Sequence, residues 1–172
     1  MKVVLISRQE IETTVSRLAA ELNRDYQHKY PILLGILKGS FIFMADLCRL
    51  LNFPLELEFI RLSSYGSGRE SSGRIKAGHG LQIPVRGRDV LVIEDIVDTG
   101  RTTTFLLGYL RRRKPASLRL CALTDKPSRR QVPVTIDYLG FTVPDKFLVG
   151  YGLDWNEKFR NFPDIYTLED EE

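Results

Sequence analysis

The chain has 172 residues, of which 43% are hydrophobic, 10% aromatic and 27% charged. This length and composition fit one globular domain and exclude collagen-like, coiled-coil and disordered chains. Lys and Arg number 25 and Asp and Glu 22, so the net charge is only +3, well below that of a dedicated nucleic-acid-binding protein. Residues 169–172 are all acidic, so the rest of the chain is more basic and suits a small polyanionic ligand.

The cysteines and the apolar runs indicate in which cellular compartment the protein is found. Cys48 and Cys121 belong to no C-x-x-C pair, which argues against a disulfide framework and a zinc site. The apolar stretch 3–6 is too short for the core of a signal peptide, and no run approaches the roughly 18 residues that span a bilayer. We therefore expect a cytoplasmic protein with no membrane partner.

Short apolar runs alternate with longer amphipathic segments, which predicts an α/β protein with a mostly parallel sheet flanked by helices. The expected strands are 3–6, 32–37, 55–62, 90–93, 118–123, 134–143 and 147–149, and the expected helices are 8–22, 41–51 and 102–113. Ser7 is the expected cap of the first helix, because Glu10 follows three residues later.

Two further expectations concern which side chains are buried. In the second helix, the inward stripe is predicted to consist of Phe41, Met44, Ala45, Cys48 and Leu51. In the strand 55–62 acidic and apolar residues alternate, so one face is expected to be buried and the other solvated. The apolar members Leu55, Leu57 and Phe59 are expected on the buried face, and Glu56 and Glu58 on the solvated one.

Residues 63–80 are rich in glycine and serine and contain little that could anchor them. A stretch of this kind inside a compact domain usually forms a lid or a binding loop. We therefore expect a mobile loop over about 63–80, and a surface hairpin with a long turn is the alternative.

The clearest chemical motif runs from Val90 to Thr104: an apolar strand, then carboxylates, then a small-residue turn into a helix. Ligands of open α/β sheets bind beyond the carboxyl ends of strands, and helix N-termini bind anions. Glu94 and Asp95 could accept hydrogen bonds from the hydroxyls of a sugar diol or hold Mg²⁺. Asp98 is then free for proton transfer. The residues expected to bind phosphate are Thr99, Gly100, Arg101, Thr102 and Thr103. The alternative is that the acids only cap the helix.

The segment 94–102, EDIVDTGRT, resembles the phosphoribosyl pyrophosphate (PRPP) signature of the type I phosphoribosyltransferases. Three further segments, 37–40, 63–65 and 147–154, resemble the hypoxanthine-guanine phosphoribosyltransferases, and the likeness covers nearly the whole chain. The resemblance implies the type I phosphoribosyltransferase fold, with a mostly parallel central sheet, flanking helices and a small hood. It also implies a single domain over 1–172 with a mobile active-site loop.

The same resemblance implies an activity. This is Mg²⁺-dependent transfer of the 5-phosphoribosyl group from PRPP to N9 of hypoxanthine or guanine, giving IMP or GMP and pyrophosphate. Asp98 is the implied catalytic residue. A homodimer or homotetramer is implied as well, as is a cis peptide bond between Leu37 and Lys38, and no nucleic-acid partner is expected.

The resemblance assigns the individual site residues. For PRPP and its phosphates these are Lys38, Gly39, Ser64, Tyr65, Glu94, Asp95, Asp98, Thr99, Gly100, Arg101, Thr102, Thr103 and Arg160. For the purine they are Lys126, Phe147, Leu148 and Asp154, and for Mg²⁺ they are Glu94, Asp95 and Asp154. Phe147 would stack on the base and the Leu148 backbone would read its edge. A cationic donor at Lys126 would favour 6-oxopurines over adenine.

Two alternatives stay open. One is a PRPP-sensing regulator of the same fold that binds nucleic acid, which the basic run 111–114 together with Arg129 and Arg130 motivates. Such a run at a helix end is usually a solvated face. The other is a xanthine-preferring or pyrimidine-specific member of the fold, so the order of preference among hypoxanthine, guanine and xanthine stays open.

Overall fold

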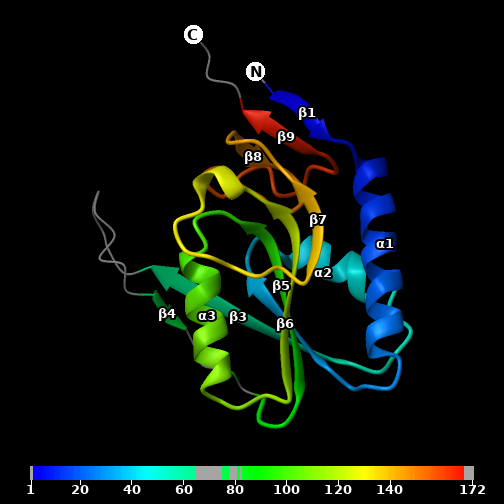
Figure 1. The fold of residues 1–172 in the computed structure, drawn as a ribbon. Helices are drawn as coiled ribbons and strands as arrows, with labels where there is room; N and C mark the ends of the chain where they lie inside the picture. Colours follow the sequence, from blue (N-terminus) through cyan, green and yellow to red (C-terminus); the bar gives the residue numbers. More distant parts are fainter. Residues whose placement is uncertain (1, 65–74, 78–80, 82, 169–172) are drawn as a thin grey trace.

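A six-stranded sheet forms the centre of the protein in the computed structural model, which describes residues 2–64, 75–77, 81 and 83–168. Its strands, in spatial order, are β4 (Ile75–Ala77), β3 (Glu56–Ser64), β2 (Ile32–Leu37), β5 (Asp89–Val97), β6 (Ser117–Asp125) and β7 (Tyr138–Thr142). The five strands from β3 to β7 run parallel, and β4 pairs antiparallel with β3. The predicted α/β class and mostly parallel sheet are confirmed (Figure 1).

A second, antiparallel sheet lies at the end of the molecule where both termini are found (Figure 1). It has the order β1 (Lys2–Ile6), β9 (Ile165–Leu168), β8 (Phe147–Val149). This small sheet is the expected hood. Because β8 belongs to it, the hood brings Phe147 and Leu148 toward the main sheet.

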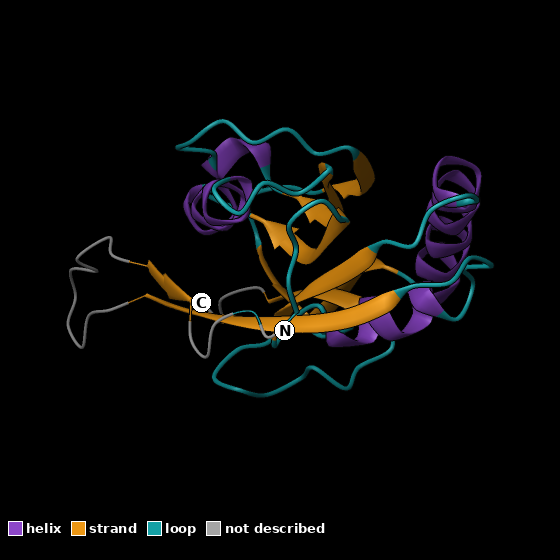
Figure 2. Ribbon diagram, turned by 90° about the horizontal axis from the view of Figure 1, so that it is seen from below, coloured by secondary structure: helices purple, strands orange, loops and turns teal. Residues whose placement is uncertain are grey.

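Helices cover both faces of the main sheet (Figure 2). They are α1 (Arg8–Tyr26), α2 (Phe41–Cys48) and α3 (Arg101–Arg111), with a short 3₁₀ turn, η1 (Pro127–Arg129). Alternate residues of the central strands enter two separate cores, so that Leu33 packs with α1 and α2 while Leu34 packs with α3. In the described part of the chain, no helix is long and apolar enough to cross a membrane.

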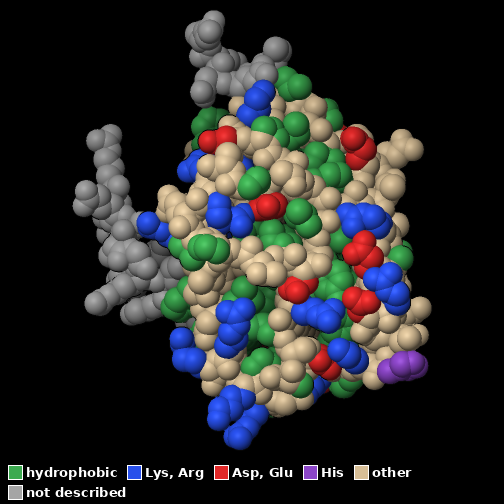
Figure 3. Space-filling view, viewed as in Figure 1, with side chains coloured by type: hydrophobic (Ala, Val, Ile, Leu, Met, Phe, Trp, Pro, Cys, Tyr) green, Lys and Arg blue, Asp and Glu red, His purple; other side chains and the backbone are tan. Residues whose placement is uncertain are grey.

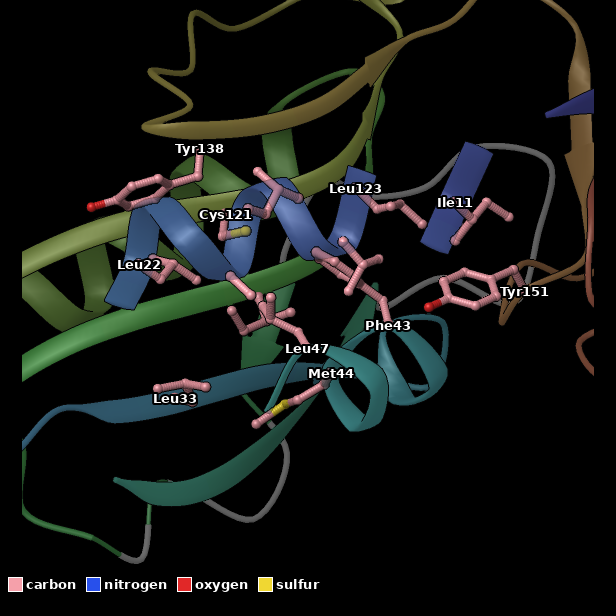
Figure 4. Close-up of a cluster of buried hydrophobic side chains, with 14 of the residues drawn as sticks. Ile11, Leu22, Leu33, Phe43, Met44, Leu47, Cys121, Leu123, Tyr138 and Tyr151 are labelled. Carbon is pink, nitrogen blue, oxygen red and sulfur yellow. The ribbon is translucent and has the colours of Figure 1, made fainter. Parts of the chain in front are cut away.

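Helix α1 begins where the sequence predicts. Ser7 and Glu10 form a capping box, in which the Ser7 amide donates to Glu10 Oε2 at 2.8 Å. Such a cap contributes about 1 kcal/mol. The predicted apolar stripe is buried from Ile11 to Leu22, and it packs against Phe43 of α2 and Cys121 of β6 (Figure 4).

The predicted inward stripe of α2 is correct for Met44, which is buried, and for Cys48 and Leu51, which are partly buried against the same core, but it is wrong for Phe41 and Ala45. Phe43, Met44 and Leu47 are buried, whereas Phe41 is 44% exposed and Ala45 is exposed. The helix has only eight residues and is apolar on nearly every side, so its sequence pattern does not define one face. Its rotation is set instead by the sheet, where the missing side chain of Gly35 makes room for the Met44 sulfur. The helix also ends at Cys48, before Leu51.

The predicted buried face of this strand is wrong for Leu57 and Phe59, although Leu55, just before β3, is partly buried against the core. Leu57 is 45% and Phe59 41% exposed, while Glu56 is half-buried and pairs with Arg88 at 2.9 Å. Leu57 lies opposite Leu33 in the register, so it points to the face that carries α1 and α2, but these helices do not extend over β3. An apolar surface is therefore left uncovered there.

The expected mobile loop lies mostly outside the described residues, and Tyr65 lies there too. Ser63 and Ser64 pair with Lys76 and Ile75, so β3 and β4 form the two arms of a hairpin. The lid itself stays a prediction. The expected strand 134–143 is shorter than predicted, because only Tyr138–Thr142 pairs with β6.

Candidate active site

The candidate site lies at the carboxyl ends of β2 and β5. β5 runs on to Val97, beyond the predicted end at Ile93, but it pairs with β2 only as far as Ile93 opposite Gly35. A cavity of about 230 Å³ opens where the two strands part. Seven of the predicted PRPP residues line it, namely Glu94, Asp95, Asp98, Thr99, Gly100, Thr102 and Thr103, together with Ile36, Leu37, Leu62 and Ile96.

The turn between β5 and α3 exposes the N-terminus of a helix to this cavity. Gly100 has φ +82°, and a Cβ there would lie 2.4 Å from the carbonyl oxygen of Val132, so the turn requires glycine. The first helical hydrogen bond runs from the Thr104 amide to Gly100 O, at 2.9 Å. The amides of residues 101–103 therefore have no carbonyl partner within the helix, which is the arrangement that binds phosphate.

A segment after β6 holds this turn in place. The amides of Gln131 and Val132 both donate to Thr99 O, at 2.9 and 3.1 Å. The Arg130 guanidinium donates to Asp98 O at 3.0 Å and to Val97 O at 3.3 Å. Sequence reasoning missed this role of Arg130, because the contacts join residues more than thirty positions apart in the chain.

The basic residues that motivated a nucleic-acid-binding alternative are therefore partly used in the site. Arg130 also pairs with Asp125, and Arg129 Nε lies 3.3 Å from Asp98 Oδ1. On the face shown in Figure 3, basic and acidic side chains are interspersed. No specific observation favours nucleic-acid binding.

The carboxylate of Asp98 lies at the rim of the cavity. Its side chain is 38% exposed, and Oδ1 accepts no hydrogen bond from the described residues despite the nearby Arg129. A carboxylate that lines a ligand cavity can take or give a proton. The cavity lining includes Asp98, and its catalytic role stays a prediction.

Glu94 and Asp95 form a buried carboxylate pair, 6% and 9% exposed. Burial, and next the charge of Asp95, raise the pKa of Glu94 well above its usual range. Burial also raises the pKa of Asp95, although the hydrogen bond with the Glu94 side chain, the backbone amides of Asp95 and Ile96 and the charge of Arg160 oppose that shift. A cation bound here would relieve the repulsion.

The donors of this pair fit Mg²⁺, which prefers oxygen ligands and usually takes one or two carboxylates together with substrate phosphate and water. Within the described residues, no group of three or more His, Cys, Asp or Glu is arranged as a complete metal site. Asp154, the third expected ligand, instead pairs with Arg160 at 2.8 Å. The arrangement suits an ion that arrives with its substrate.

Glu94→Gln is expected to stabilise the metal-free protein at neutral pH. The folded pKa of Glu94 is raised, so its contribution to stability is complete below the ordinary value of 4.5 and is lost as the pH rises through the folded pKa. Each pKa unit corresponds to about 1.4 kcal/mol, and each kcal/mol to about 2–4 °C in Tm. Thermal melts in EDTA between pH 4 and 8 would measure this, and a Tm difference that does not grow with pH would contradict it.

Gly39 lies between the carboxylate pair and a neighbouring loop. A Cβ at Gly39 would lie 1.7 Å from Asp95 Oδ2, and one at Gly152, which has φ +101°, would lie 2.0 Å from Gly39 O. Both positions therefore require glycine. The peptide bond between Leu37 and Lys38 is cis, as expected.

The loop after β8 supplies a cation, Arg160, that lies near Lys38. Arg160 donates to Gly152 O at 2.8 Å and pairs with Asp154. Glu157 Oε2 lies 2.9 Å from Lys38 Nζ and 3.2 Å from Arg160 Nη2, and the contacts with Lys38 and then Arg160 lower the pKa of Glu157. Sequence reasoning did not select Glu157, although its position three residues before Arg160 was a signal. Lys38 and Arg160 are thus brought together.

The expected purine residues form a third group. Lys126 is buried, its amide donates to Val97 O at 3.0 Å, and its Nζ donates to Lys146 O at 2.8 Å, beside Phe147. Phe147 is 52% exposed, and its ring lies 6.2 Å from the ring of Trp155, centroid to centroid. Leu148 is buried, so only its backbone is suited to reading a base.

Comparison with known proteins supports one family. The model of the phosphoribosyl transferase domain matches residues 6–156. The hypoxanthine-guanine phosphoribosyltransferase of Bacillus subtilis is 46% identical over 166 residues, which cover 96% of this chain and 92% of that protein. The enzyme of that name from Aquifex aeolicus is 45% identical over 97% of this chain and 94% of its own.

Solved structures agree with the sequence relatives. A hypoxanthine phosphoribosyltransferase from Staphylococcus aureus superimposes with a TM-score of 0.92 at 41% identity, covering 97% of this chain and 91% of the other. The predicted type I phosphoribosyltransferase fold is thereby confirmed. The chain belongs to the phosphoribosyltransferase family and, within it, to the group of the hypoxanthine-guanine phosphoribosyltransferases.

Proposed function

We propose that this protein transfers the 5-phosphoribosyl group of PRPP to N9 of hypoxanthine or guanine and releases pyrophosphate, a purine-salvage reaction. The observation that carries the proposal is the meeting of three groups at the carboxyl ends of β2 and β5. These groups are the helix N-terminus and its turn at 99–103, the buried carboxylates Glu94 and Asp95, and the cations Lys38 and Arg160. Each matches one part of PRPP: the 5′-phosphate, the ribose diol and the pyrophosphate.

The reaction breaks the bond between C1 of the ribose and the pyrophosphate oxygen, and forms the bond from C1 to N9. Positive charge develops on the sugar while a polyanion departs, so the cations at Lys38 and Arg160 stabilise the transition state. Asp98 accepts the proton from N7 of the purine as N9 bonds to C1. Glu94 and Asp95 would hold one Mg²⁺, and Asp154 would hold a second only on leaving Arg160; the metal would supply further charge neutralisation.

The dependence on Mg²⁺ is tested by incubating the protein with hypoxanthine and PRPP in MgCl₂ or in excess EDTA. We expect IMP only where Mg²⁺ is present. Equal formation of IMP in EDTA would remove the metal from the proposal.

Lys126→Met is expected to lower kcat/KM for hypoxanthine by about 10- to 100-fold, the contribution of a hydrogen bond to a charged group. The purine 6-oxo group would lose its donor, while adenine, which offers a donor of its own there, would not be disfavoured further. Initial rates with both bases give the ratio. Lys29→Met, at the opposite end of β2, is the matched control, and an unchanged ratio in Lys126→Met would contradict the assignment.

We also propose that two copies of the chain associate, as a homodimer or within a homotetramer. The apolar surface that α2 and β3 leave uncovered, with Phe41, Leu57 and Phe59 each more than 40% exposed, supports this. Light scattering measures the mass in solution, and a mass of one chain would contradict the proposal.

A further inference from the structure

The carboxylate of Glu157 occupies the place between the two cations assigned to pyrophosphate. Its Oε2 accepts from Lys38 Nζ at 2.9 Å and from Arg160 Nη2 at 3.2 Å. The two cations come from loops more than a hundred residues apart in the chain, and this single oxygen joins them. A pyrophosphate oxygen bound by both cations would have to take this position.

The backbone of Glu157 is fixed while its side chain is free to leave. The Glu157 amide donates to Asp154 Oδ2 at 2.8 Å, and residues 156 and 157 both have left-handed φ angles, +52° and +63°. Residues other than glycine seldom adopt this backbone conformation, so the contacts of the loop must hold it in place. The Glu157 side chain is nevertheless 62% exposed, so rotation about its own bonds can release the carboxylate.

Arg160 stays in position without Glu157. It donates to Gly152 O at 2.8 Å and pairs with Asp154 Oδ1 at 2.8 Å, and its side chain is only 19% exposed. Its Nε is buried and donates to no described residue. Removal of the Glu157 charge would therefore leave an oriented cation whose Nη2 has lost one acceptor.

We propose that Glu157 is an internal counter-ion that holds Lys38 and Arg160 between turnovers and competes with pyrophosphate for them. This rests on the proposed function, in which these cations receive the pyrophosphate group. A polyanion binds two cations more strongly than one carboxylate does, so the substrate displaces Glu157. The tethered carboxylate returns at high effective concentration and favours release of the product.

The test is Glu157→Gln, which keeps the shape of the side chain and removes its charge. Calorimetric titration with sodium pyrophosphate, with and without MgCl₂, should give a Kd about 1.5- to 5-fold lower than that of the wild type, the range for an exposed ion pair. KM for PRPP should fall, inhibition by pyrophosphate should strengthen, and kcat should not rise. Glu12→Gln, which removes an exposed ion pair with Arg8 in α1, is the control for net charge.

The direction of the change in Kd distinguishes a side chain that competes with pyrophosphate from one that only orients the two cations. If Glu157 only oriented the two cations, Glu157→Gln would bind pyrophosphate more weakly, and that result, like an unchanged Kd in an active enzyme, overturns the inference alone. A wild-type protein that neither binds pyrophosphate nor turns over PRPP overturns the proposed function as well. A gain in affinity matched by Glu12→Gln would be a general charge effect and would also overturn the inference.

Discussion

Asp98→Asn is expected to lower kcat by about 10²- to 10⁴-fold, the range for loss of a general acid–base group, while the protein stays folded. Asparagine keeps the shape of the side chain but cannot accept the N7 proton of the purine. The main-chain contacts that hold this position, from Arg130 to Asp98 O and Val97 O, do not involve the carboxylate. The phosphate turn should therefore survive, and KM for PRPP should change much less than kcat.

Steady-state kinetics with hypoxanthine, with a thermal melt of the same sample, would measure the Asp98→Asn effect. Asp145→Asn is a matched control, because Asp145 is also a carboxylate near Arg129, at 4.0 Å, but does not line the cavity. Near-normal turnover in Asp98→Asn would remove Asp98 from the mechanism. A comparable loss in Asp145→Asn would indicate that the electrostatic field around Arg129, rather than proton transfer to Asp98, controls turnover.

Gly39→Ala is expected to reduce turnover by about 10²-fold or more, since a misplacement of about 1 Å in an active site can cost that much. The new Cβ would lie 1.7 Å from Asp95 Oδ2, so the buried carboxylate or the loop that carries Lys38 has to move. Overpacking of this kind costs about 1–3 kcal/mol. At about 2–4 °C per kcal/mol, the melting temperature should fall by several degrees.

Gly108→Ala is the matched control for this substitution. Gly108 lies inside α3, where the nearest atom to an added Cβ is 4.0 Å away, and alanine is expected to stabilise a helix interior by about 0.5–1 kcal/mol. Activity and melting temperature would be measured for both variants. A Gly39→Ala enzyme as active as Gly108→Ala would contradict the account of Asp95 and the 37–40 loop.

Local sequence signals predicted the elements whose residue pattern fits only one secondary structure. The capping box at Ser7 fixes the start of α1, and the apolar run after Pro31 fixes β2 as 32–37. The failures have a common cause. In α2 and β3, the elements that pack against each segment decide which of its sides is buried. Gly35 provides space for Met44, and no described element covers Phe59. The local residue pattern predicts neither of these features.

The candidate site divides in the same way. The phosphate turn is continuous in sequence, so residues 98–103 could be predicted together. Arg130 and Glu157 could not, because their contacts with Asp98 O and with Lys38 exist only after distant loops are packed together. Gly39 was identified from a resemblance, and the structure adds the reason: its missing side chain lets Asp95 approach.

The most direct test of the central claim is PRPP-dependent pyrophosphate release by the wild-type protein with hypoxanthine, guanine, xanthine and adenine in parallel, with the nucleotide products identified. We expect turnover with hypoxanthine and guanine, giving IMP and GMP, and little with adenine. A preference for xanthine or adenine would contradict the roles given to Lys126 and Phe147. Absence of turnover with every base, despite binding of PRPP, would contradict the proposed enzyme and favour a PRPP-sensing regulator.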